Sequence, residues 1–234
     1  MAIGNISVIV AIFTTLLLNT CEAMKENSFK NTIKQGGDLV NVTIFNFTDP
    51  NTDAFENWIE VSDGGRSKAT LVKLKGQNYQ SGILFYLLTP RKNGSSFAGV
   101  HRIVQIDVLP VYDGVIIDLH KQGPHSHFKL FYGECSDTSN CASNESVFET
   151  SGEREQVTIP FRNSSAYLHG TPLSNSKFSG LTQKSHIGIK VYGGSNAQRN
   201  QCGPGSIEIF TISAYKEGSN ASLKRSSLWG FKTT

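Results

Sequence analysis

Four residues around a Gly-Pro turn could bind a metal ion. Asp118, His120, His125 and His127 flank the segment K-Q-G-P. Imidazole and carboxylate groups are ligands that zinc and copper take in proteins. If His120 faced His125 across the turn, directly opposed Cβ atoms would lie roughly 5 Å apart, and the four side chains could meet at one ion. The alternative is that they form the polar, solvent-facing side of a hairpin, and we therefore assign no resident cofactor.

Both interpretations require a β-hairpin that holds these residues on one face. In this register Ile117 would face Phe128 and Val115 would face Leu130. Side chains alternate between the two faces of a strand, so these four apolar residues would share the other face. The sequence therefore predicts a hairpin with one apolar and one polar side.

Similar β-like segments, separated by turn residues, recur along the chain. Alternating or apolar runs of β-formers at short intervals are typical of a sandwich or a barrel. Turns such as D-P-N, Y-D-G and G-P-G separate them. The polar segment Asn163 to Ser185 is expected to be a long loop. The predicted strands are Val42–Phe47, Trp58–Ser62, Ala69–Lys75, Ser81–Leu88, Ala98–Val108, Gly114–His120, His125–Tyr132, Gln156–Phe161, Ile187–Tyr192 and Ser206–Ala214.

Two early motifs and several late ones resemble those of a known family. The early motifs are N-W-I-E-V-S-D-G-G-R-S from Asn57 and T-P-R-K-N-G-S-S-F-A-G-V up to Val100. The late ones include V-T-I-P-F, I-G-I-K-V-Y-G-G and G-P-G-S-I-E-I-F-T-I. This pattern, over roughly Val42 to Tyr215, resembles the complex I intermediate-associated protein 30 family. The resemblance implies an all-β fold, a galactose-binding-like β-sandwich (jelly roll).

The S-D-G-G-R-S loop carries the candidate ligand-binding residues. Asp63 and Arg66 could present a charged rim to a sugar or a partner chain, with Trp58 nearby as a stacking platform. In the other interpretation, Asp63 closes the turn through a side-chain hydrogen bond and Trp58 is a core aromatic residue. Family members usually have two or more residues between Ser-Asp and Gly-Gly, whereas Asp63 here directly precedes Gly64.

The first 23 residues are typical of a signal peptide. An almost uninterrupted apolar run extends from Ile6 to Leu18, and no Lys or Arg precedes Lys25. This run is short for a membrane span but suits a signal sequence, and a mitochondrial presequence would be Arg-rich. We expect cleavage after Ala23 and secretion without stable membrane insertion, the alternative being an uncleaved anchor. The predicted organisation is residues 1–23 signal peptide, 24–41 N-terminal lead, 42–215 β-sandwich domain and 216–234 polar basic tail.

Cysteine and asparagine usage agrees with the secretory route. Cys135 and Cys141 flank a five-residue polar loop and are predicted to form a disulfide, which would leave Cys202 odd; pairing of Cys202 with either of the others is the alternative. Six N-x-S/T sequons are candidate glycosylation sites. They begin at Asn41, Asn46, Asn93, Asn144, Asn163 and Asn220.

Composition and missing motifs narrow the function. The formal net charge of +3 and the lack of a dense basic cluster argue against a nucleic-acid partner. G-x-S-x-G, H-E-x-x-H and Gly-rich phosphate loops are absent, which argues against an enzyme. We therefore expect a secreted, non-catalytic binding module whose ligand is a carbohydrate or a protein. The alternative implied by the resemblance is a chaperone or assembly factor for mitochondrial respiratory complex I.

Overall fold

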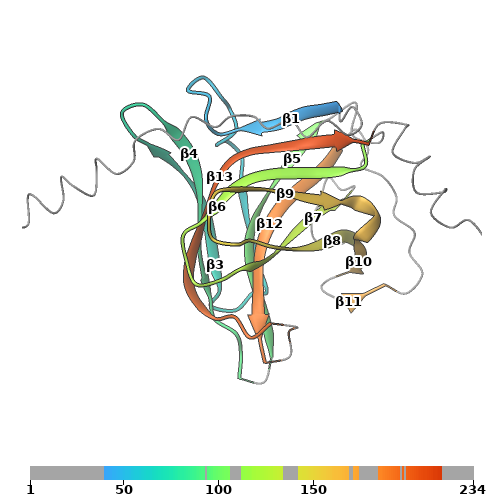
Figure 1. Cartoon of the computed structure of the whole chain (residues 1–234). Helices are drawn as coiled ribbons and strands as arrows, with labels where there is room; N and C mark the ends of the chain where they lie inside the picture. The colour runs from blue at the N-terminus through green and yellow to red at the C-terminus, as the bar shows by residue number, and fades with distance from the viewer. Residues whose placement is uncertain are drawn as a thin grey trace, which may run out of the picture. The chain divides into compact units, whose positions relative to one another are not determined.

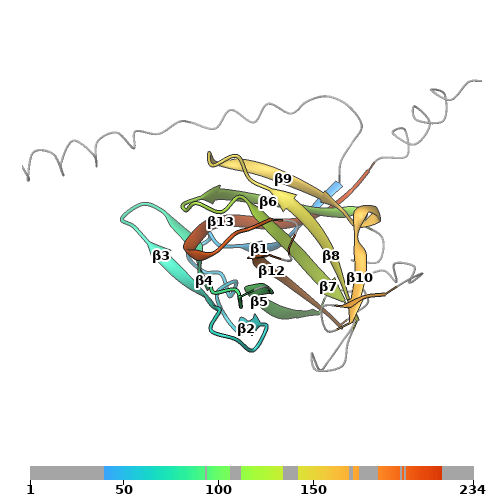
Figure 2. The same ribbon diagram turned by 90° about the horizontal axis from the view of Figure 1, so that it is seen from below.

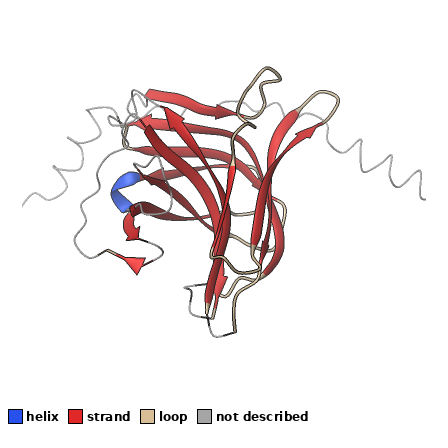
Figure 3. Ribbon diagram, turned by 180° about the vertical axis from the view of Figure 1, so that it is seen from behind, coloured by secondary structure: helices blue, strands red, loops and turns tan. Residues whose placement is uncertain are grey.

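Antiparallel β-strands make up almost all of the regular structure. The computed structural model describes residues 40–92, 94–105, 112–133, 142–168, 171–173, 184–195, 197 and 199–217. In these ranges the strands form two sheets that pack face to face (Figure 1). The helical part of the described ranges is one short 3-10 turn, η2 (Phe161–Asn163), drawn blue in Figure 3. None of their helices has the length and apolar character needed to cross a membrane.

One layer of the sandwich is a six-stranded sheet. Its strands follow the order β3-β4-β13-β6-β9, and β1 pairs with β13 beside this path. The long strand β13 pairs with β4 along its first half and with β1 along its second half. On its other side it pairs with β6, and the register of that pairing shifts between Ile209 and Thr211. The bounds are β1 Val40–Asn46, β3 Lys68–Lys75, β4 Gln80–Leu88, β6 Gly114–Lys121, β9 Glu155–Pro160 and β13 Gly203–Lys216.

The other layer is a seven-stranded sheet. Its order is β11-β10-β8-β7-β12-β5-β2, so the long strand β12 lies between β7 and β5. Figure 2 shows this layer from below, with β7, β8 and β10 side by side. The bounds are β2 Ile59–Ser62, β5 Ser95–Gln105, β7 His127–Gly133, β8 Ala142–Glu149, β10 Ser165–Leu168, β11 Thr171–Pro172 and β12 Lys184–Gly194.

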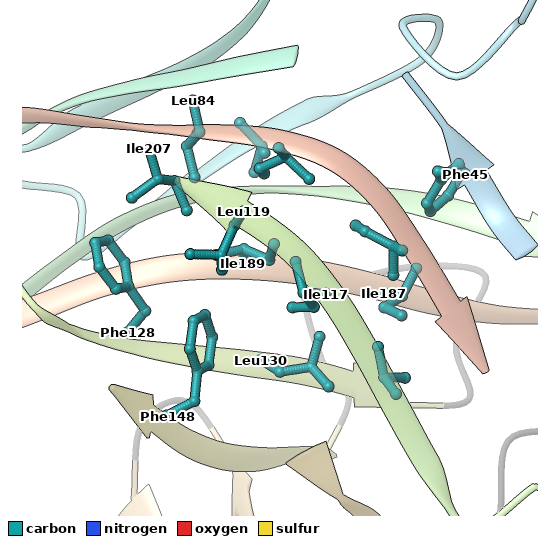
Figure 4. Packing of buried hydrophobic residues seen from close by; sticks show 14 of the residues in the cluster. Phe45, Leu84, Ile117, Leu119, Phe128, Leu130, Phe148, Ile187, Ile189 and Ile207 are labelled. Carbon is teal, nitrogen blue, oxygen red and sulfur yellow. The ribbon is translucent and has the colours of Figure 1, made fainter. Parts of the chain in front are cut away.

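The core lies between the two sheets. Alternate residues of each strand point inward, so the inner faces supply aliphatic and aromatic side chains that interdigitate. Leu119 of β6 and Ile207 of β13 come from one sheet, while Ile189 of β12 and Phe128 of β7 come from the other (Figure 4). All four side chains are buried, with 0 to 1% of their surface exposed. The intervening residues of the same strands point to the outer faces of the sheets, where they do not take part in this core.

The predicted all-β sandwich is confirmed, and its ten predicted strands are present with shifted ends. Two predictions along the chain were wrong. Strand β8 was missed, because its inward positions include polar residues such as Asn144 and Ser146. The expected long loop after Asn163 contains β10 and β11 instead, although residues 174–183 lie outside the described ranges. The predicted strand end at Val108 also lies outside them, β5 being described as far as Gln105.

The predicted hairpin around Gly123-Pro124 was wrong. Strand β6 pairs with β13 and β9 in one sheet, whereas β7 pairs with β8 and β12 in the other. The turn therefore crosses from one sheet to the other. Apolar side chains on both strands point inward from opposite layers, which is why the sequence pattern looked like one shared apolar face.

The central packing gives a first prediction. Leu119→Ala should lower the free energy of unfolding by about 2–5 kcal/mol, because the fully buried side chain would leave a cavity between the sheets. Leu87→Ala is the matched control: Leu87 is 44% exposed on β4, and its loss should cost less than about 1 kcal/mol. Urea unfolding followed by intrinsic fluorescence measures both, and equal losses would contradict this assignment of the core.

Candidate functional site

The four residues predicted to share a metal ion are not brought together. Asp118 and His120 lie on β6, whereas His127 begins β7 in the other sheet. Asp118 accepts two hydrogen bonds from Arg154, from Nε at 3.1 Å and from Nη2 at 2.9 Å. Within the described ranges no group of three or more His, Cys, Asp or Glu side chains could hold a metal ion. The predicted shared metal site was therefore wrong, because the turn at Gly123-Pro124 places β6 and β7 in different sheets.

The three histidines each contact other groups. His120 Nδ1 lies 3.6 Å from Glu208 Oε2, and His127 Nε2 lies 2.5 Å from Glu149 Oε1. The buried His125 ring lies 3.2 Å from the Tyr86 hydroxyl and 2.9 Å from the carbonyl oxygen of Cys202. His125 therefore ties the start of β7 to β4 and to the residue before β13.

The candidate residues of the S-D-G-G-R-S loop separate in the structure. Trp58 packs against the core next to Phe45 and Phe47, and its Nε1 donates to the carbonyl oxygen of Ala54 at 2.6 Å. Asp63 Oδ1 accepts a hydrogen bond from Gly65 N at 3.2 Å. Trp58 is therefore packed as a core aromatic residue and Asp63 closes its own turn, which is the second of the two interpretations of this loop.

Asp63 also lines a hollow in the protein surface. The hollow has a volume of about 560 Å³. Arg66 is exposed and is not among the described residues that line it. The described lining residues are Asp63, Ser95, Ser96, Phe97, Lys129, Glu145, Val147, Asn163, Ser165, Tyr167, Lys190, Tyr192 and Ala197.

Strand alternation explains why the hollow lies on the outer face of the seven-stranded sheet. On β12, Ile187, Ile189 and Val191 belong to the core, so Lys190 and Tyr192 point to the other side. The same alternation applies to β7, β8 and β5. Lys190 stands opposite Lys129 in the β12–β7 register, and Phe131 of β7 stands opposite Glu145 of β8 in the next row.

A glycine allows the side chains of this face to lie close to the backbone. At Gly188 of β12, a Cβ atom would lie 2.5 Å from Cζ of Phe131 and 2.4 Å from the carbonyl oxygen of Val100. Cβ atoms do not approach other atoms so closely, so a larger residue here would push the Phe131 ring away. Gly188 thus allows the Phe131 ring to lie against the sheet backbone, beside Lys190.

Two lysines and one glutamate form the floor of the hollow. Lys190 Nζ lies 2.5 Å from Glu145 Oε1, and Lys129 Nζ lies 2.9 Å from Glu145 Oε2. Burial by itself raises the pKa of Glu145, but the two positive charges outweigh it and hold that pKa below its usual value. Burial lowers the pKa of Lys190, and Glu145 opposes this shift. Glu145 is therefore an ionised carboxylate with both oxygens engaged.

Aromatic rings surround both ammonium groups. Lys129 Nζ lies 4.9 Å from the ring centroid of Tyr167 and 4.8 Å from that of Tyr192. Lys190 Nζ lies 4.5 Å from the centroid of Phe97. Such contacts attract a cation to the face of a ring. Both tyrosines are also among the residues that line the hollow.

Two buried histidines lie beside this floor. His101 and His186 are 2% and 4% exposed, and their ring centroids are 6.0 Å apart. In the described part of the chain, neither nitrogen of His101 nor Nδ1 of His186 has a hydrogen-bond partner. Burial, followed by the influence of His101 and of Lys190, lowers the pKa of His186 to about 4. Burial also lowers the pKa of His101. Both imidazoles are therefore neutral at pH 7.

The predicted glycosylation sites and cysteines lie at several separate places in the chain. Asn41 and Asn163 are exposed, and Asn46 Oδ1 accepts a hydrogen bond from the hydroxyl of Thr48 in its own sequon at 2.7 Å. Asn144 is 9% exposed within β8, a poor position for a glycan. Asn93, Asn220, Cys135 and Cys141 lie outside the described residues, whereas Cys202 is a free, exposed cysteine.

The residues that form the hollow's floor were not predicted from the sequence. A signal for two of them was present, because Lys129 and Lys190 each interrupt an otherwise apolar strand, in F-K-L and I-K-V. A charged residue between core positions of a strand must lie on the outer face. That both lysines meet one glutamate of β8 depends on the strand order, which the sequence does not show.

Comparisons with known proteins support the fold. The sequence matches no protein-family model and no curated protein. Among solved structures, it is similar to the family 11 carbohydrate-binding module from Clostridium thermocellum in complex with a beta-1,3-1,4-mixed-linked tetrasaccharide (TM-score 0.55, 12% identity, 76% of this chain and 96% of that one). It is equally similar to the family 11 module of the cellulosomal cellulase Lic26A-Cel5E of the same organism (TM-score 0.55, 12% identity, 76% and 95%). At this identity the similarity establishes a jelly-roll β-sandwich.

The buried ion pairs give a second prediction. Glu145→Gln should lower the free energy of unfolding by about 3–5 kcal/mol, because it leaves the buried Lys190 ammonium without a counter-charge. Glu149→Gln on the same strand is the matched control. The Glu149 side chain is 62% exposed, and its pairs should contribute less than about 1 kcal/mol. Denaturant titration at pH 7 compares the two, and equal losses would show that the floor is not held by Glu145.

The neutral histidines give a third prediction. The pKa of His186 is about 4 in the folded chain and 6.5 in the unfolded chain, so between these pH values the unfolded chain binds more protons. Stability should therefore fall as the pH is lowered from 6.5 to 4, with at most about 3 kcal/mol from His186.

The comparison of two variants tests this pH dependence. His186→Gln should reduce the loss of stability over this window, as thermal melts at several pH values would show. His120→Gln, in the other sheet with a side chain 39% exposed, should leave the loss in place. An unchanged loss in His186→Gln would contradict the assignment.

Proposed function

We propose that this protein is a non-catalytic carbohydrate-binding module that binds its ligand in the hollow of the seven-stranded sheet. The observation that carries this proposal is the combination of aromatic walls with fixed hydrogen-bonding groups. Tyr167 and Tyr192 line the hollow beside Lys129 and Glu145, and Asp63 lies on its wall. Sugars present apolar ring faces and many hydroxyl groups, and a site with both kinds of surface suits them.

The preorganisation of the floor supports binding. The two ion pairs and the four cation–π contacts fix the lysines, so little side-chain freedom is lost when a ligand arrives. The similarity to two carbohydrate-binding modules supports the same proposal at the level of the fold.

The chemistry of the hollow favours binding over catalysis. Glu145 has both oxygens in ion pairs and a lowered pKa, so it is not available to donate a proton. Asp63 is the other carboxylate among the described lining residues, and it closes its own turn. Those lining residues include serines but no histidine that could activate one as a nucleophile.

Two further predictions remain part of this proposal. The apolar leader suggests that the module is secreted, with Asn41, Asn46, Asn93, Asn163 and Asn220 as candidate glycan sites. Asn163 lines the hollow, so a glycan there would stand at the edge of the binding site. The family resemblance, and with it the alternative role in complex I assembly, stays a prediction.

Calorimetry with a panel of neutral and acidic oligosaccharides tests the proposed function. Tyr167→Ala should weaken the best ligand by roughly tenfold or more, because one wall of the hollow is removed. Tyr79→Ala is the matched control, since Tyr79 is 52% exposed and follows β3, in the other sheet. The protein should be produced without glycosylation, so that Asn163 carries no sugar. Absence of binding across the panel at millimolar concentration would refute the proposal.

A further inference from the structure

The floor of the hollow has more hydrogen-bond donors than acceptors. Lys129 and Lys190 each donate one hydrogen bond to Glu145, and these two bonds use both carboxylate oxygens. An ammonium group has three N–H donors, so each lysine keeps two more. No other residue in the described ranges accepts a hydrogen bond from either group. A ligand that reaches the floor therefore meets unused donors.

The floor also has an excess of positive charge. Two lysines and one glutamate leave one net positive charge, and the three side chains are 17%, 9% and 4% exposed for Lys129, Lys190 and Glu145. Asp63 also lines the hollow, but it forms no ion pair with either lysine. The aromatic rings attract the ammonium groups without neutralising them. Because little of these three side chains is exposed, their charge is screened less than that of surface residues.

From this donor and charge excess we infer that the hollow selects a saccharide that carries a carboxylate or a sulfate group. The anionic group contacts the free N–H donors of Lys129 and Lys190, and the sugar ring lies against Tyr167. Lys129 is the more exposed of the two lysines and makes the first contact. This inference rests on the proposed function and adds the class of sugar.

A neutral sugar satisfies the floor less well. Its hydroxyl oxygens can accept from the lysines, but they bring no charge to balance the buried positive one. A hydrogen bond from a lysine to a hydroxyl oxygen has one charged partner, whereas a bond to a carboxylate or a sulfate has two and adds the attraction between opposite charges. The geometry thus favours acidic over neutral sugars of the same backbone.

Calorimetry with three matched oligosaccharides tests the inference. The probes are a β-1,4-linked glucose oligomer, the glucuronate oligomer of the same length, and a sulfated form of the glucose oligomer. At low ionic strength at least one acidic probe should bind about tenfold tighter than the neutral one, and added salt should reduce the difference. The two acidic probes show whether the anionic group is a carboxylate or a sulfate.

Variants locate the source of the preference. Lys129→Gln should remove most of the acidic-over-neutral ratio, whereas Lys75→Gln removes the same charge from an exposed position on β3 and should leave the ratio unchanged. Asp63→Asn removes a negative charge from the wall and should increase the ratio. The ratio is measured within each variant, so a general loss of affinity does not imitate the effect. If Lys129→Gln fails to fold, the wild-type salt dependence and Asp63→Asn still test the inference.

The outcomes separate the inference from the proposed function. Equal binding of neutral and acidic probes, or tighter binding of the neutral one, would overturn the inference and leave the proposed function standing. A ratio that persists in Lys129→Gln would also overturn it. If no saccharide of any kind binds, both fall together.

Discussion

The contact between Glu145 and two lysines governs the outer face of the seven-stranded sheet. It brings together β8, β7 and β12, and it places charged groups where a strand would otherwise carry apolar or fully solvated side chains. Replacing buried ion pairs by apolar residues is often neutral or stabilising, so stability alone does not explain them. This fixed, partly unsatisfied charge between aromatic rings is the feature on which we base the proposed binding site.

The sandwich is the scaffold that makes this arrangement possible. The inner faces of both sheets form one apolar core, in which Phe128, Ile187 and Ile189 hold β7 and β12 side by side (Figure 4). Because side chains alternate, each fixed inward residue also fixes the direction of its outward neighbours. Beside the floor, burial lowers the pKa values of His101 and His186 and keeps both rings neutral. Three of their ring nitrogens have no hydrogen-bond partner in the described ranges, which is unfavourable for stability.

The sequence predicts the fold better than the site. The strands were predictable because most carry apolar residues with β-propensity between clear turn residues, whereas β8 was missed for its polar inward positions. The site depends on which strands become neighbours. The turn at Gly123-Pro124 looked like a hairpin, yet it crosses between the sheets and separates His120 from His127. Conversely, Lys129, Glu145 and Lys190 are far apart in the sequence and meet only through the order β8-β7-β12.

Mapping of the ligand contacts by NMR tests the central claim most directly. Backbone amide shifts of the isotopically labelled protein would be recorded while an acidic oligosaccharide is added. We predict that the largest changes fall on β7, β8, β10 and β12, around Lys129, Glu145, Tyr167 and Lys190. Changes confined to the six-stranded sheet, for example around the exposed Phe85, would contradict the claim that the hollow is the binding site.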